Sequence, residues 1–502
     1  MTLDAKAPPE GELLNTENLR IDPNLALRVP ANLALRRLML AFATAEKKVL
    51  VACADPTDRA GLDAMERYLN MPVIARRADA ETLRRTLHRV YPDPQAPALR
   101  PGSASRVEAD DDSIALTDEI LRFAVLRQAS DIHIEPRRDG VRIRLRVDGQ
   151  LEELRRLPLG RLTGLVSRLK VQCGMDIAEK RAAQDGSFVW TSGTGRDRMA
   201  VDIRAATVPL KYGERMTLRL LSQQAGGLTL EKLGMLAGDL QCFADAIAAP
   251  HGLILINGPT GSGKSTTLYA AIRGMDHESL NIITVEDPIE YEMEEISQVS
   301  VDSAEKVTFA NSLRSVLRHD PDVVMVGEIR DLETADIAIK AGLTGHLVLS
   351  TLHTNSAPGA VTRLIDMGVQ PYLVAATLRM SVAQRLVRRL CVHCRKPRAL
   401  RAGEAAALGR SSAVGQTVYD AVGCPYCAGR GYAGRLGVYE IMVCDDEIHN
   451  LIGSKATEHR IREVALLKGM RSLRHDATDK VLAGITSVAE AIENTDGPAI
   501  RK

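Results

Sequence analysis

The stretch Gly258-Pro-Thr-Gly-Ser-Gly-Lys-Ser265, entered from the apolar run Leu253-Ile-Leu-Ile256, decides the fold of one part of this chain. Its glycines let backbone N–H groups turn inward toward phosphate oxygens, and the following helix offers its positive N-terminal end to the same point. Lys264 is expected to reach the β- and γ-phosphates, and the Ser265 hydroxyl to bind Mg²⁺. The strand, loop and helix together predict a nucleoside triphosphate site. This phosphate loop comprises Gly258, Pro259, Thr260, Gly261, Ser262, Gly263, Lys264, Ser265 and Thr266.

Length and composition favour several globular domains. The chain has 502 residues, 45% of them hydrophobic and 26% charged, which predicts about three domains. Because 65 basic residues face 64 acidic ones, no overall field favours nucleic acid or an acidic membrane. The sequence contains neither a run of about eighteen apolar residues nor a charged start followed by an apolar stretch. We therefore expect a cytosolic protein without a membrane span.

A proline-rich stretch separates a small N-terminal domain from the rest. Residues 92–112 contain four prolines and end in three aspartates, with little apolar content, which is typical of a linker. Before it, residues 1–91 alternate predicted strands with helices, one of which places Leu62, Met65 and Leu69 on one face. This α/β domain carries no catalytic cluster. We expect it to bind a partner, the alternative being an inert folding domain.

Residues 113–225 are predicted to form an α+β domain. Val141-Arg-Ile-Arg-Leu-Arg-Val147 alternates strictly, and Asp148-Gly149 with Leu151-Glu-Glu-Leu154 completes a hairpin pattern. Further strands are expected at 199–203 and 216–221. The polar face of the hairpin carries Arg142, Arg144 and Arg146. We interpret it as a solvated edge face that resists aggregation, the alternative being an anion-binding face.

Two acidic clusters are expected beside the phosphate loop, in a nucleotide-binding α/β domain at 226–390. The strand Val323-Val-Met-Val326 ends in Gly327-Glu328, a Walker B arrangement with glycine where a metal-bound aspartate is expected. A second cluster contains Glu286 and Glu290, which the turn at Pro288 keeps near another strand end. A carboxylate there can orient or deprotonate water. The sequence leaves open which of the three glutamates is the general base.

Two histidines bracket the next apolar strand. His346 precedes and His353 follows the run Leu347-Val-Leu-Ser-Thr-Leu352. In a nucleoside triphosphatase this pattern indicates either a sensor of the γ-phosphate or a contact between subunits.

Four of the eight cysteines form two pairs, Cys391-Val-His-Cys394 and Cys424-Pro-Tyr-Cys427. In a reducing cytosol, pairs at this spacing favour metal binding over disulfides. Four thiolates suit tetrahedral Zn²⁺ and leave no open position, so we predict a structural zinc site. A redox role is the alternative. Haem attachment is excluded because no histidine directly follows either pair. The predicted ligands are Cys391, Cys394, Cys424 and Cys427.

Taken together, these motifs resemble the secretion ATPase superfamily. The resemblance covers about residues 113–490 and is most specific to the type II secretion assembly ATPases, with the type IV pilus assembly ATPases as near neighbours. Residues 18–91 resemble the family's N-terminal recruitment domain more loosely. Besides the phosphate loop and the cysteines, the motifs are Ala129-Ser-Asp-Ile-His-Ile-Glu-Pro136, Ile177-Ala-Glu-Lys-Arg181, Gln184-Asp-Gly186, Tyr212-Gly-Glu-Arg215, Leu230-Glu-Lys-Leu-Gly-Met235, Val285-Glu-Asp-Pro-Ile-Glu290 and Asp320-Pro-Asp-Val-Val-Met-Val-Gly-Glu-Ile-Arg-Asp331.

The resemblance implies an α/β, multidomain chain with a RecA-like ATPase domain at 226–390. An N-terminal recruitment domain (1–91), a linker (92–112) and an α+β middle domain (113–225) would precede it, and a tetracysteine zinc segment (391–440) and a helical region (441–502) would follow. It further implies a homohexamer at the inner membrane, held by the cytosolic domain of a secretion component and by a platform protein. Its ATP hydrolysis would assemble a pseudopilus and so drive protein export across the outer membrane.

The resemblance also implies residue roles. Glu290 is the candidate base and Glu328 the Walker B acid, while His346 and His353 form the histidine box. Two further residues match middle-domain arginines that approach the γ-phosphate, and these are Arg204 and Arg219.

Two other functions compete with this interpretation. A nucleic-acid translocase shares the phosphate loop, but it predicts a basic groove or an aromatic stacking platform. With 3% aromatic residues and a net charge of +1, we expect no nucleic-acid partner. A zinc-ribbon module that binds nucleotide without hydrolysing it is the second alternative, and the carboxylates of Glu290 and Glu328 argue against it.

Overall fold

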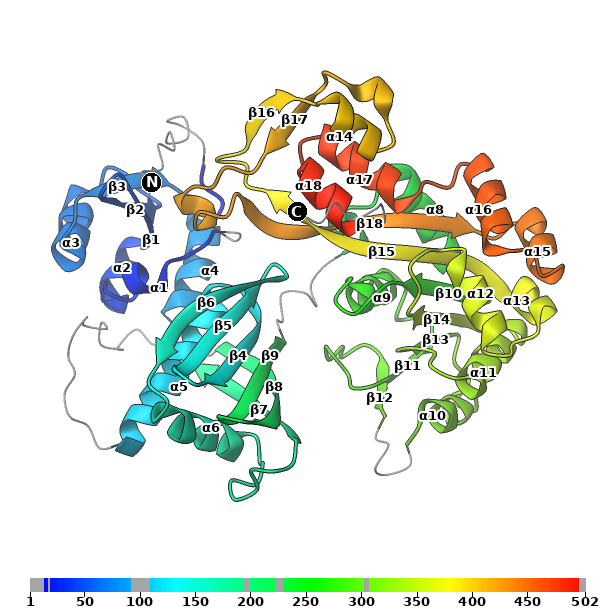
Figure 1. Cartoon of the computed structure of the whole chain (residues 1–502), viewed down its shortest axis with the longest axis horizontal. Coiled ribbons are helices and arrows are strands. Elements are labelled where there is room, and N and C mark those ends of the chain that lie inside the picture. Colours follow the sequence, from blue (N-terminus) through cyan, green and yellow to red (C-terminus); the bar gives the residue numbers. More distant parts are fainter. Residues whose placement is uncertain are drawn as a thin grey trace. The chain divides into compact units, whose positions relative to one another are not determined.

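The computed structural model describes residues 13–16, 19–91, 109–192, 199–221, 229–301 and 307–495. The chain forms two compact units, which Figure 1 shows together with the element labels. One unit comprises Met1–Ser222, Leu390–Lys396 and Ala421–Gly434, and the other comprises Gln223–Arg389, Pro397–Asp420 and Arg435–Lys502. The range predicted as one tetracysteine segment, 391–440, is thus divided between the units. The predicted linker lies outside the described residues except for its last four, which begin helix α5.

The N-terminal domain is α/β, as the sequence predicted, and contains a three-stranded sheet, of which β1 was not predicted. Strands β1 and β2 are antiparallel, and β2 and β3 are parallel. Helices α3 and α4 each begin at an aspartate whose side chain accepts a hydrogen bond from a backbone N–H of the first turn, Asp58 and Asp79. The elements are α1 (Pro23–Ala26), α2 (Ala31–Arg37), β1 (Met39–Ala45), β2 (Lys48–Cys53), α3 (Arg59–Leu69), β3 (Val73–Arg77) and α4 (Ala80–Val90).

The middle domain is a six-stranded antiparallel sheet covered on its apolar face by α5 and α6. The strand order is β6-β5-β4-β9-β8-β7. The predicted hairpin is confirmed as β5 and β6, and the later predicted strands as β8 and β9. The elements are α5 (Ala109–Leu126), β4 (Ala129–Arg137), β5 (Gly140–Val147), β6 (Gln150–Leu157), α6 (Arg161–Gln172), β7 (Gln184–Ser192), β8 (Met199–Leu210) and β9 (Gly213–Leu221).

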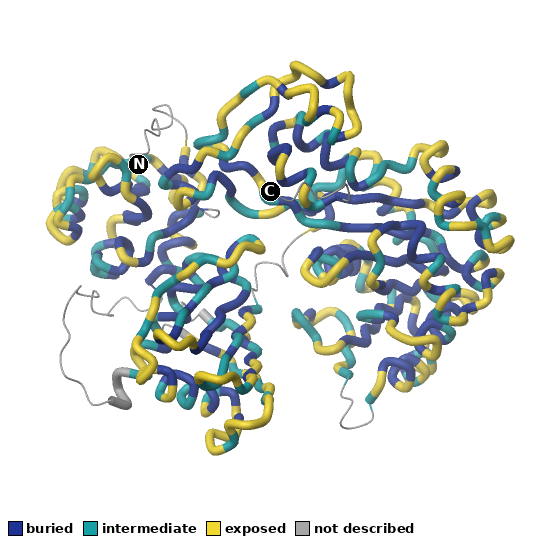
Figure 2. Tube along the Cα trace, in the orientation of Figure 1, coloured by how far each residue is buried: buried dark blue, intermediate teal, exposed yellow. Residues whose placement is uncertain are grey.

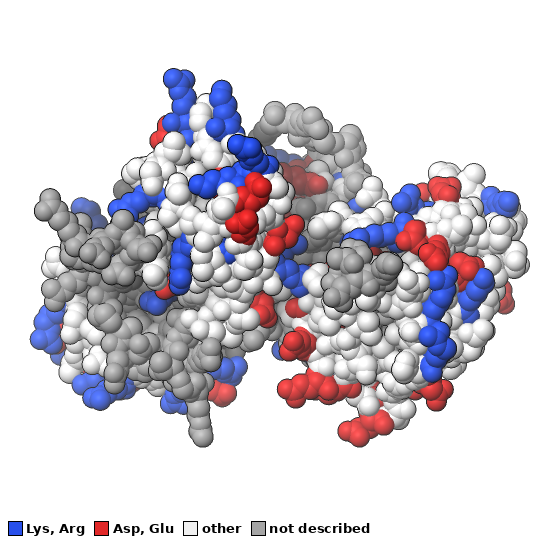
Figure 3. All heavy atoms as spheres, turned by 90° about the horizontal axis from the view of Figure 1, so that it is seen from below, with Lys and Arg blue, Asp and Glu red and all other residues white. Residues whose placement is uncertain are grey.

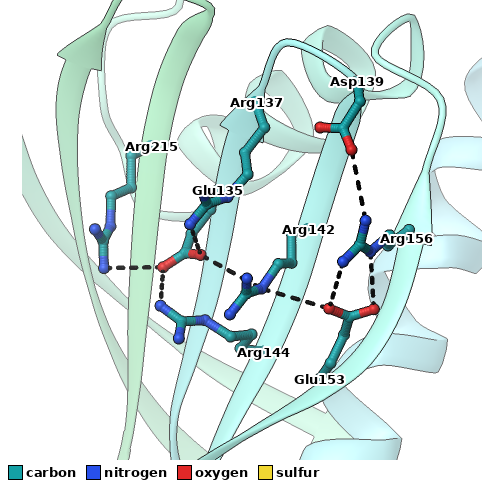
Figure 4. Close-up of polar contacts among 8 residues, drawn as sticks. All are labelled: Glu135, Arg137, Asp139, Arg142, Arg144, Glu153, Arg156 and Arg215. Atoms are coloured by element: carbon teal, nitrogen blue, oxygen red, sulfur yellow. Dashed lines mark hydrogen bonds and ion pairs between the residues drawn. The ribbon is translucent and has the colours of Figure 1, made fainter.

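The prediction that the arginines of β5 form a solvated edge face is wrong. Strand β5 pairs with β6 on one side and with β4 on the other, so it is not at an edge. Its register places Arg142 and Arg146 opposite Glu135 and Asp131 of β4. Figure 4 shows the Glu135 carboxylate among the guanidinium groups of several neighbouring arginines. The arginines of this face thus contact the chain's own buried carboxylates, because the acidic residues alternate along β4 in phase with the arginines of β5.

The second unit is built on a seven-stranded sheet of order β12-β11-β13-β14-β10-β15-β18. Strands β12, β11, β13, β14, β10 and β15 are parallel neighbours. Leu253 and Leu255 pack into the core on one face, and Ile254 and Ile256 into the core on the other. Burial on both faces explains the continuous apolar runs of the sequence, and Figure 2 shows these central strands as buried.

Helices cover both faces of this sheet. Helices α8 and α9 contribute to one core, and α10–α13 with the C-terminal helices contribute to the other. The elements are η2 (Leu230–Leu233), α8 (Ala237–Ile247), β10 (Gly252–Asn257), α9 (Lys264–Arg273), β11 (Ile282–Glu286), β12 (Ser297–Ser300), α10 (Phe309–Val316), β13 (Val323–Val326), α11 (Leu332–Leu343), β14 (Leu347–Leu352), α12 (Gly359–Asp366), α13 (Pro371–Thr377), β15 (Leu378–Leu390) and β18 (Tyr432–Val443).

The remainder of the chain adds a small two-stranded sheet, β16 with β17, and the C-terminal helices. In the part of the chain that the structure describes, no helix is long and apolar enough to cross a membrane. The elements are β16 (Lys396–Ala399), α14 (Ala402–Ala407), η3 (Ser411–Ala413), β17 (Thr417–Asp420), η4 (Pro425–Cys427), α15 (Asp446–Gly453), α16 (Glu458–Leu467), α17 (Leu473–Leu482) and α18 (Val488–Asn494).

Candidate nucleotide and zinc sites

The phosphate loop lies between β10 and α9, at the carboxyl end of the parallel strands. Gly258, Gly261 and Gly263 have φ angles of +154°, +80° and +89°, a region that glycine adopts without steric cost. A Cβ at Gly258 would lie 2.5 Å from the Ser262 Oγ and 2.6 Å from the carbonyl oxygen of Gln384. The loop therefore needs glycine here, and its N–H groups with the start of α9 suit a phosphate chain.

Lys264 is the first residue of α9. Its Nζ donates hydrogen bonds to the carbonyl oxygens of Gly258 (2.8 Å) and Pro259 (3.2 Å), so the amine lies over the loop. Burial lowers the pKa of this amine, while the nearby Glu328 carboxylate acts in the opposite direction. Ser265 follows it in the first helical turn and is exposed. Both residues thus lie at the start of the helix that follows the phosphate loop, and their binding of phosphate and Mg²⁺ stays a prediction.

Glu328 lies two residues after the end of β13 and takes part in a charged network. The Arg330 guanidinium pairs with one of its carboxylate oxygens, and the His353 Nε2 lies 3.2 Å from the other. Arg330 also pairs with Asp287 at 3.4 Å. Burial alone would raise the pKa of Glu328, but the hydrogen bond and charge of Arg330, together with His353, hold it below its usual range. The network thus links residues at the carboxyl ends of β11, β13 and β14, and it keeps the Glu328 carboxylate ionised.

The two predicted histidines lie at opposite ends of β14. His353 is at the carboxyl end, beside Glu328, whereas His346 precedes the strand and its Nδ1 lies 3.1 Å from the carbonyl oxygen of Ala341 in α11. Six strand residues separate the histidines by about 20 Å. The fold of this unit thus brings His353, and not His346, to the phosphate-loop edge of the sheet.

Glu286 is buried and its oxygens are used as hydrogen-bond acceptors. The Tyr269 hydroxyl and the Thr284 Oγ1 donate to one oxygen each, and the Gln298 amide donates at 3.1 Å. The Tyr269 hydroxyl also accepts from the backbone N–H of Glu290 at 3.3 Å. Glu286 therefore serves to fix the turn that carries Glu290, which leaves Glu290 and Glu328 as candidate bases.

Arg204 and Arg219 lie opposite each other on β8 and β9 of the middle domain. The Nε of Arg219 is 3.2 Å from an Asp131 carboxylate oxygen, yet 57% of the Arg219 side chain remains exposed. The two arginines are thus placed on one face by register. Their predicted approach to a γ-phosphate stays a prediction.

The four paired cysteines come together as the sequence predicted. Their Sγ atoms all lie within 4.8 Å of one another, with Cys391–Cys424 and Cys424–Cys427 at 3.8 Å and Cys394–Cys427 at 3.9 Å. In a regular tetrahedron with Zn–S bonds of about 2.3 Å, neighbouring sulfurs lie about 3.8 Å apart. These separations fit one Zn²⁺ and are far longer than the S–S bond of a disulfide, about 2.05 Å.

The surroundings of these sulfurs also favour a metal. Backbone N–H groups of Gly431 and Cys424 donate to the Cys427 Sγ at 3.1 and 3.2 Å. Two N–H donors on one sulfur stabilise its thiolate form. Because a thiolate is the form that binds metal, this chemistry suits zinc.

The family follows from comparison with known proteins. The family described as Type II/IV secretion system protein matches residues 107–493, and the MshEN domain matches residues 12–97. This chain belongs to the Type II/IV secretion system protein family. Type II secretion system protein E of Aeromonas hydrophila is 45% identical over 456 residues, covering 90% of this chain and 89% of that protein. The Pseudomonas aeruginosa protein of the same name is 41% identical, covering 93% and 96%.

The chain is also similar to pilus ATPases and to other ATPases of known structure. The type IV pilus assembly ATPase PilB of Myxococcus xanthus is 37% identical, covering 96% of this chain and 88% of its own. The solved pilus retraction motor PilT with bound ADP is 28% identical with a TM-score of 0.52, covering 76% of this chain and 97% of its own. The Legionella pneumophila ATPase DotB, at 23% identity and a TM-score of 0.56, covers 78% and 96% and shares the fold. The predicted family, the α/β fold and the ATPase activity are thereby confirmed.

Sequence reasoning missed three residues that shape the nucleotide site. Arg330 pairs with Glu328, Tyr269 fixes the turn before Glu290, and the Gln384 side chain accepts a 2.8 Å hydrogen bond from Thr267 in α9. Arg330 belongs to the motif Asp320–Asp331 described above and follows Glu328 by two residues, so its position was a signal that could have found it. The other two act across the fold, and nothing local marks them.

Proposed function

We propose that this chain is the assembly ATPase of a type II secretion system. It works as a homohexamer at the cytosolic side of the inner membrane, and its ATP hydrolysis assembles a pseudopilus that drives protein export across the outer membrane. The observation that carries the proposal is one sheet edge where the phosphate loop, Glu328 with His353, and the turn of Glu290 meet, in a chain similar to type II secretion proteins over nearly their whole length.

Each residue at this sheet edge has its own role in the proposed ATP hydrolysis. Lys264 and Ser265 hold the phosphates and Mg²⁺, which neutralises charge on the β- and γ-phosphates. Glu328 is the Walker B acid, and its depressed pKa keeps it ionised at neutral pH. Glu290 is the candidate base that orients water. Because His353 contacts Glu328, it is suited to sense the γ-phosphate, whereas His346 is better suited to a contact elsewhere.

In this proposal, arginines of the middle domain stabilise the transition state. Arg204 and Arg219 approach the γ-phosphate and stabilise the charge that develops during transfer. Zn²⁺ on the four cysteines stabilises the fold and takes no part in hydrolysis. Residues 1–91 bind the cytosolic domain of an inner-membrane secretion component, and a platform protein receives the mechanical work.

A single variant series tests the proposal. Purified chain should hydrolyse ATP with Mg²⁺, and Lys264→Ala or Glu328→Gln should lower the rate on the order of a hundredfold or more, because each removes charge stabilisation from the transition state. In cells that lack the native gene, the wild-type chain should restore secretion and the variants should not. Glu328→Gln turning over ATP at the wild-type rate would refute the Walker B assignment.

A type IV pilus assembly ATPase is the second candidate, favoured by the similarity to PilB over 96% of this chain. Restored pili without restored secretion would establish it. Stimulation by DNA would instead support a translocase, although the face drawn in Figure 3 carries acidic as well as basic side chains. A chain that binds ATP without turnover would support the non-hydrolysing zinc-ribbon module.

A further inference from the structure

The loop after β14 carries His353 and is held by several hydrogen bonds. We call residues 353–359 the histidine loop. Within it, the Ser356 Oγ accepts from the backbone N–H of Gly359 at 3.0 Å, and Thr354 Oγ1 donates to the Ser356 carbonyl oxygen at 3.1 Å. Ser356 is 8% exposed and Ala357 is fully buried. The loop thus becomes buried at Ser356, three residues after the exposed His353.

Two carboxylates from the C-terminal part of the chain hold this loop. The Glu440 Oε1, on β18, accepts a 2.8 Å hydrogen bond from the backbone N–H of Ala357. The Glu458 Oε1, on α16, accepts a 2.7 Å hydrogen bond from the Ser356 hydroxyl. A Cβ at Gly359 would lie 2.7 Å from the Ser356 Oγ and 3.5 Å from both Glu458 oxygens, so glycine permits this approach.

One arginine joins the two carboxylates. Arg462 of α16 donates to the Glu440 Oε2 at 3.2 Å and to the Glu458 Oε1 at 3.3 Å. Glu440 is only 2% exposed, so its carboxylate is bonded to these protein groups in place of water. We call Glu440, Glu458 and Arg462 the C-terminal brace.

The braced loop is also bonded to the residue that precedes the phosphate loop. The Ser381 Oγ donates to the Ala357 carbonyl oxygen at 2.7 Å and accepts from the Asn257 amide at 2.8 Å. Asn257 directly precedes Gly258. All these groups are buried, where a misplaced polar atom costs about 1–3 kcal/mol. The brace, the histidine loop and the start of the phosphate loop are therefore fixed relative to one another.

We propose that the C-terminal brace positions His353 against Glu328, and that Ser356, Glu440, Glu458 and Arg462 are positioning residues for ATP hydrolysis. The inference rests on the proposed function, which makes Glu328 and His353 part of the hydrolytic site. It assigns to β18 and α16 a direct influence on kcat through hydrogen bonds to a loop about 100 residues earlier in the sequence.

Ser356→Ala is the most direct test, because it removes one hydroxyl and leaves the buried charges in place. In full-length protein we expect kcat to fall about tenfold, the value of one well-made hydrogen bond, with the KM for MgATP changed less than about twofold. Glu458→Ala should have the same effect. Glu458→Gln retains an acceptor oxygen and should keep most of the activity. Glu463→Ala, on the exposed side of the same helix where Glu463 pairs with Arg460, is the matched control and should match the wild type.

A double-mutant cycle separates positioning from general damage to the fold. If the brace acts through His353, Ser356→Ala should lower kcat no further in a His353→Ala background. Additive losses, an unchanged kcat in Ser356→Ala, or equal losses in Glu463→Ala would each overturn the inference while leaving the proposed function intact. A wild-type rate in Lys264→Ala would overturn the proposed function, and the inference with it.

Discussion

Glu135 offers a measurable test of the arginine cluster in the middle domain. Its side chain is 5% exposed. One oxygen lies 2.5 Å from Arg144 and 3.3 Å from Arg215, and the other lies 3.6 Å from Arg137 and 4.0 Å from Arg142 (Figure 4). Glu135→Gln keeps the shape and one acceptor oxygen, but it removes the charge and turns an amide toward two guanidinium groups.

The expected loss of stability follows from these contacts. Removing one partner from a buried ion pair costs about 3–5 kcal/mol, and from an exposed pair less than about 1 kcal/mol. The four arginines are 19–53% exposed and can turn partly toward water. We therefore expect Glu135→Gln to lower the free energy of unfolding of this domain by about 2 kcal/mol at pH 7.

The assay uses the only tryptophan of the chain. Trp190 lies on β7, is 4% exposed and donates to Asp118 at 3.2 Å, so its fluorescence during urea unfolding reports on the middle domain. Glu153→Gln is the matched control, since Glu153 is on β6, on the other side of β5 in the same sheet, pairs with Arg142 and Arg156, and is 40% exposed. It should cost less than about 1 kcal/mol. Equal midpoints for wild type and Glu135→Gln would refute the reasoning, as would equal losses in both variants.

The pH dependence has a definite sign. Burial alone would raise the pKa of Glu135, but the Arg144 hydrogen bond and the surrounding arginines lower it below the ordinary value of 4.5. Because the folded pKa is depressed, the ionised carboxylate contributes its full stability above about pH 4.5, and the contribution is lost as pH falls through the lower folded pKa. The difference between wild type and Glu135→Gln should thus be largest near pH 7 and shrink below about pH 4.5.

Three further predictions concern the metal, the middle-domain arginines and the N-terminal domain. Purified protein should contain one Zn²⁺ per chain by metal analysis, and a variant with all four cysteines changed to serine should contain none; full retention would exclude these ligands. Specific ATPase activity should rise with protein concentration. Arg219→Ala should abolish ATPase activity while nucleotide binding persists. A fully active Arg204→Ala, Arg219→Ala double variant would remove the basis for placing these arginines at the γ-phosphate. Deleting residues 1–91 should leave ATP binding intact but abolish membrane association and secretion in cells, and a deletion variant that still sediments with membranes would locate the tether elsewhere.

Much of the fold could be predicted because its signals are local. Each apolar run buried on both faces of the parallel sheet is continuous in sequence, and the phosphate loop is fixed by residues within eight positions. Alternation together with the Asp148-Gly149 turn predicts the hairpin of β5 and β6. Alternation does not reveal a strand's neighbours, however, and the error about β5 arose there: Asp131 and Glu135 on β4 supply the countercharges that the strand itself lacks.

A site residue could be predicted only where a suitable residue type occurs at a recognisable position in the sequence, such as the end of a predicted element. Lys264, Glu328 and His353 each follow or begin an element whose end is visible in the sequence. The residues that contact them carry no such local signal. Glu458 contacts Ser356 across 102 residues and Arg219 contacts Asp131 across 88, separations that no periodicity encodes. A single sequence identifies the residues that could do the chemistry, whereas the residues that hold them in place appear only with the fold.

The four cysteines of the predicted zinc site also pack against residues that are distant in the sequence, which the spacing of the motif did not reveal. Spacing indicated that four thiols would meet, but Cys391, Cys424 and Cys427 also belong to the apolar cluster of the N-terminal strands. Tyr426, between two of the ligands, packs on Phe42 of β1 with ring centroids 5.3 Å apart. Thiolates in apolar surroundings are costly unless a cation neutralises them. A zinc ion that closes this site would therefore also stabilise the surface against which β1 packs, and metal binding would then be thermodynamically linked to the packing of the N-terminal domain.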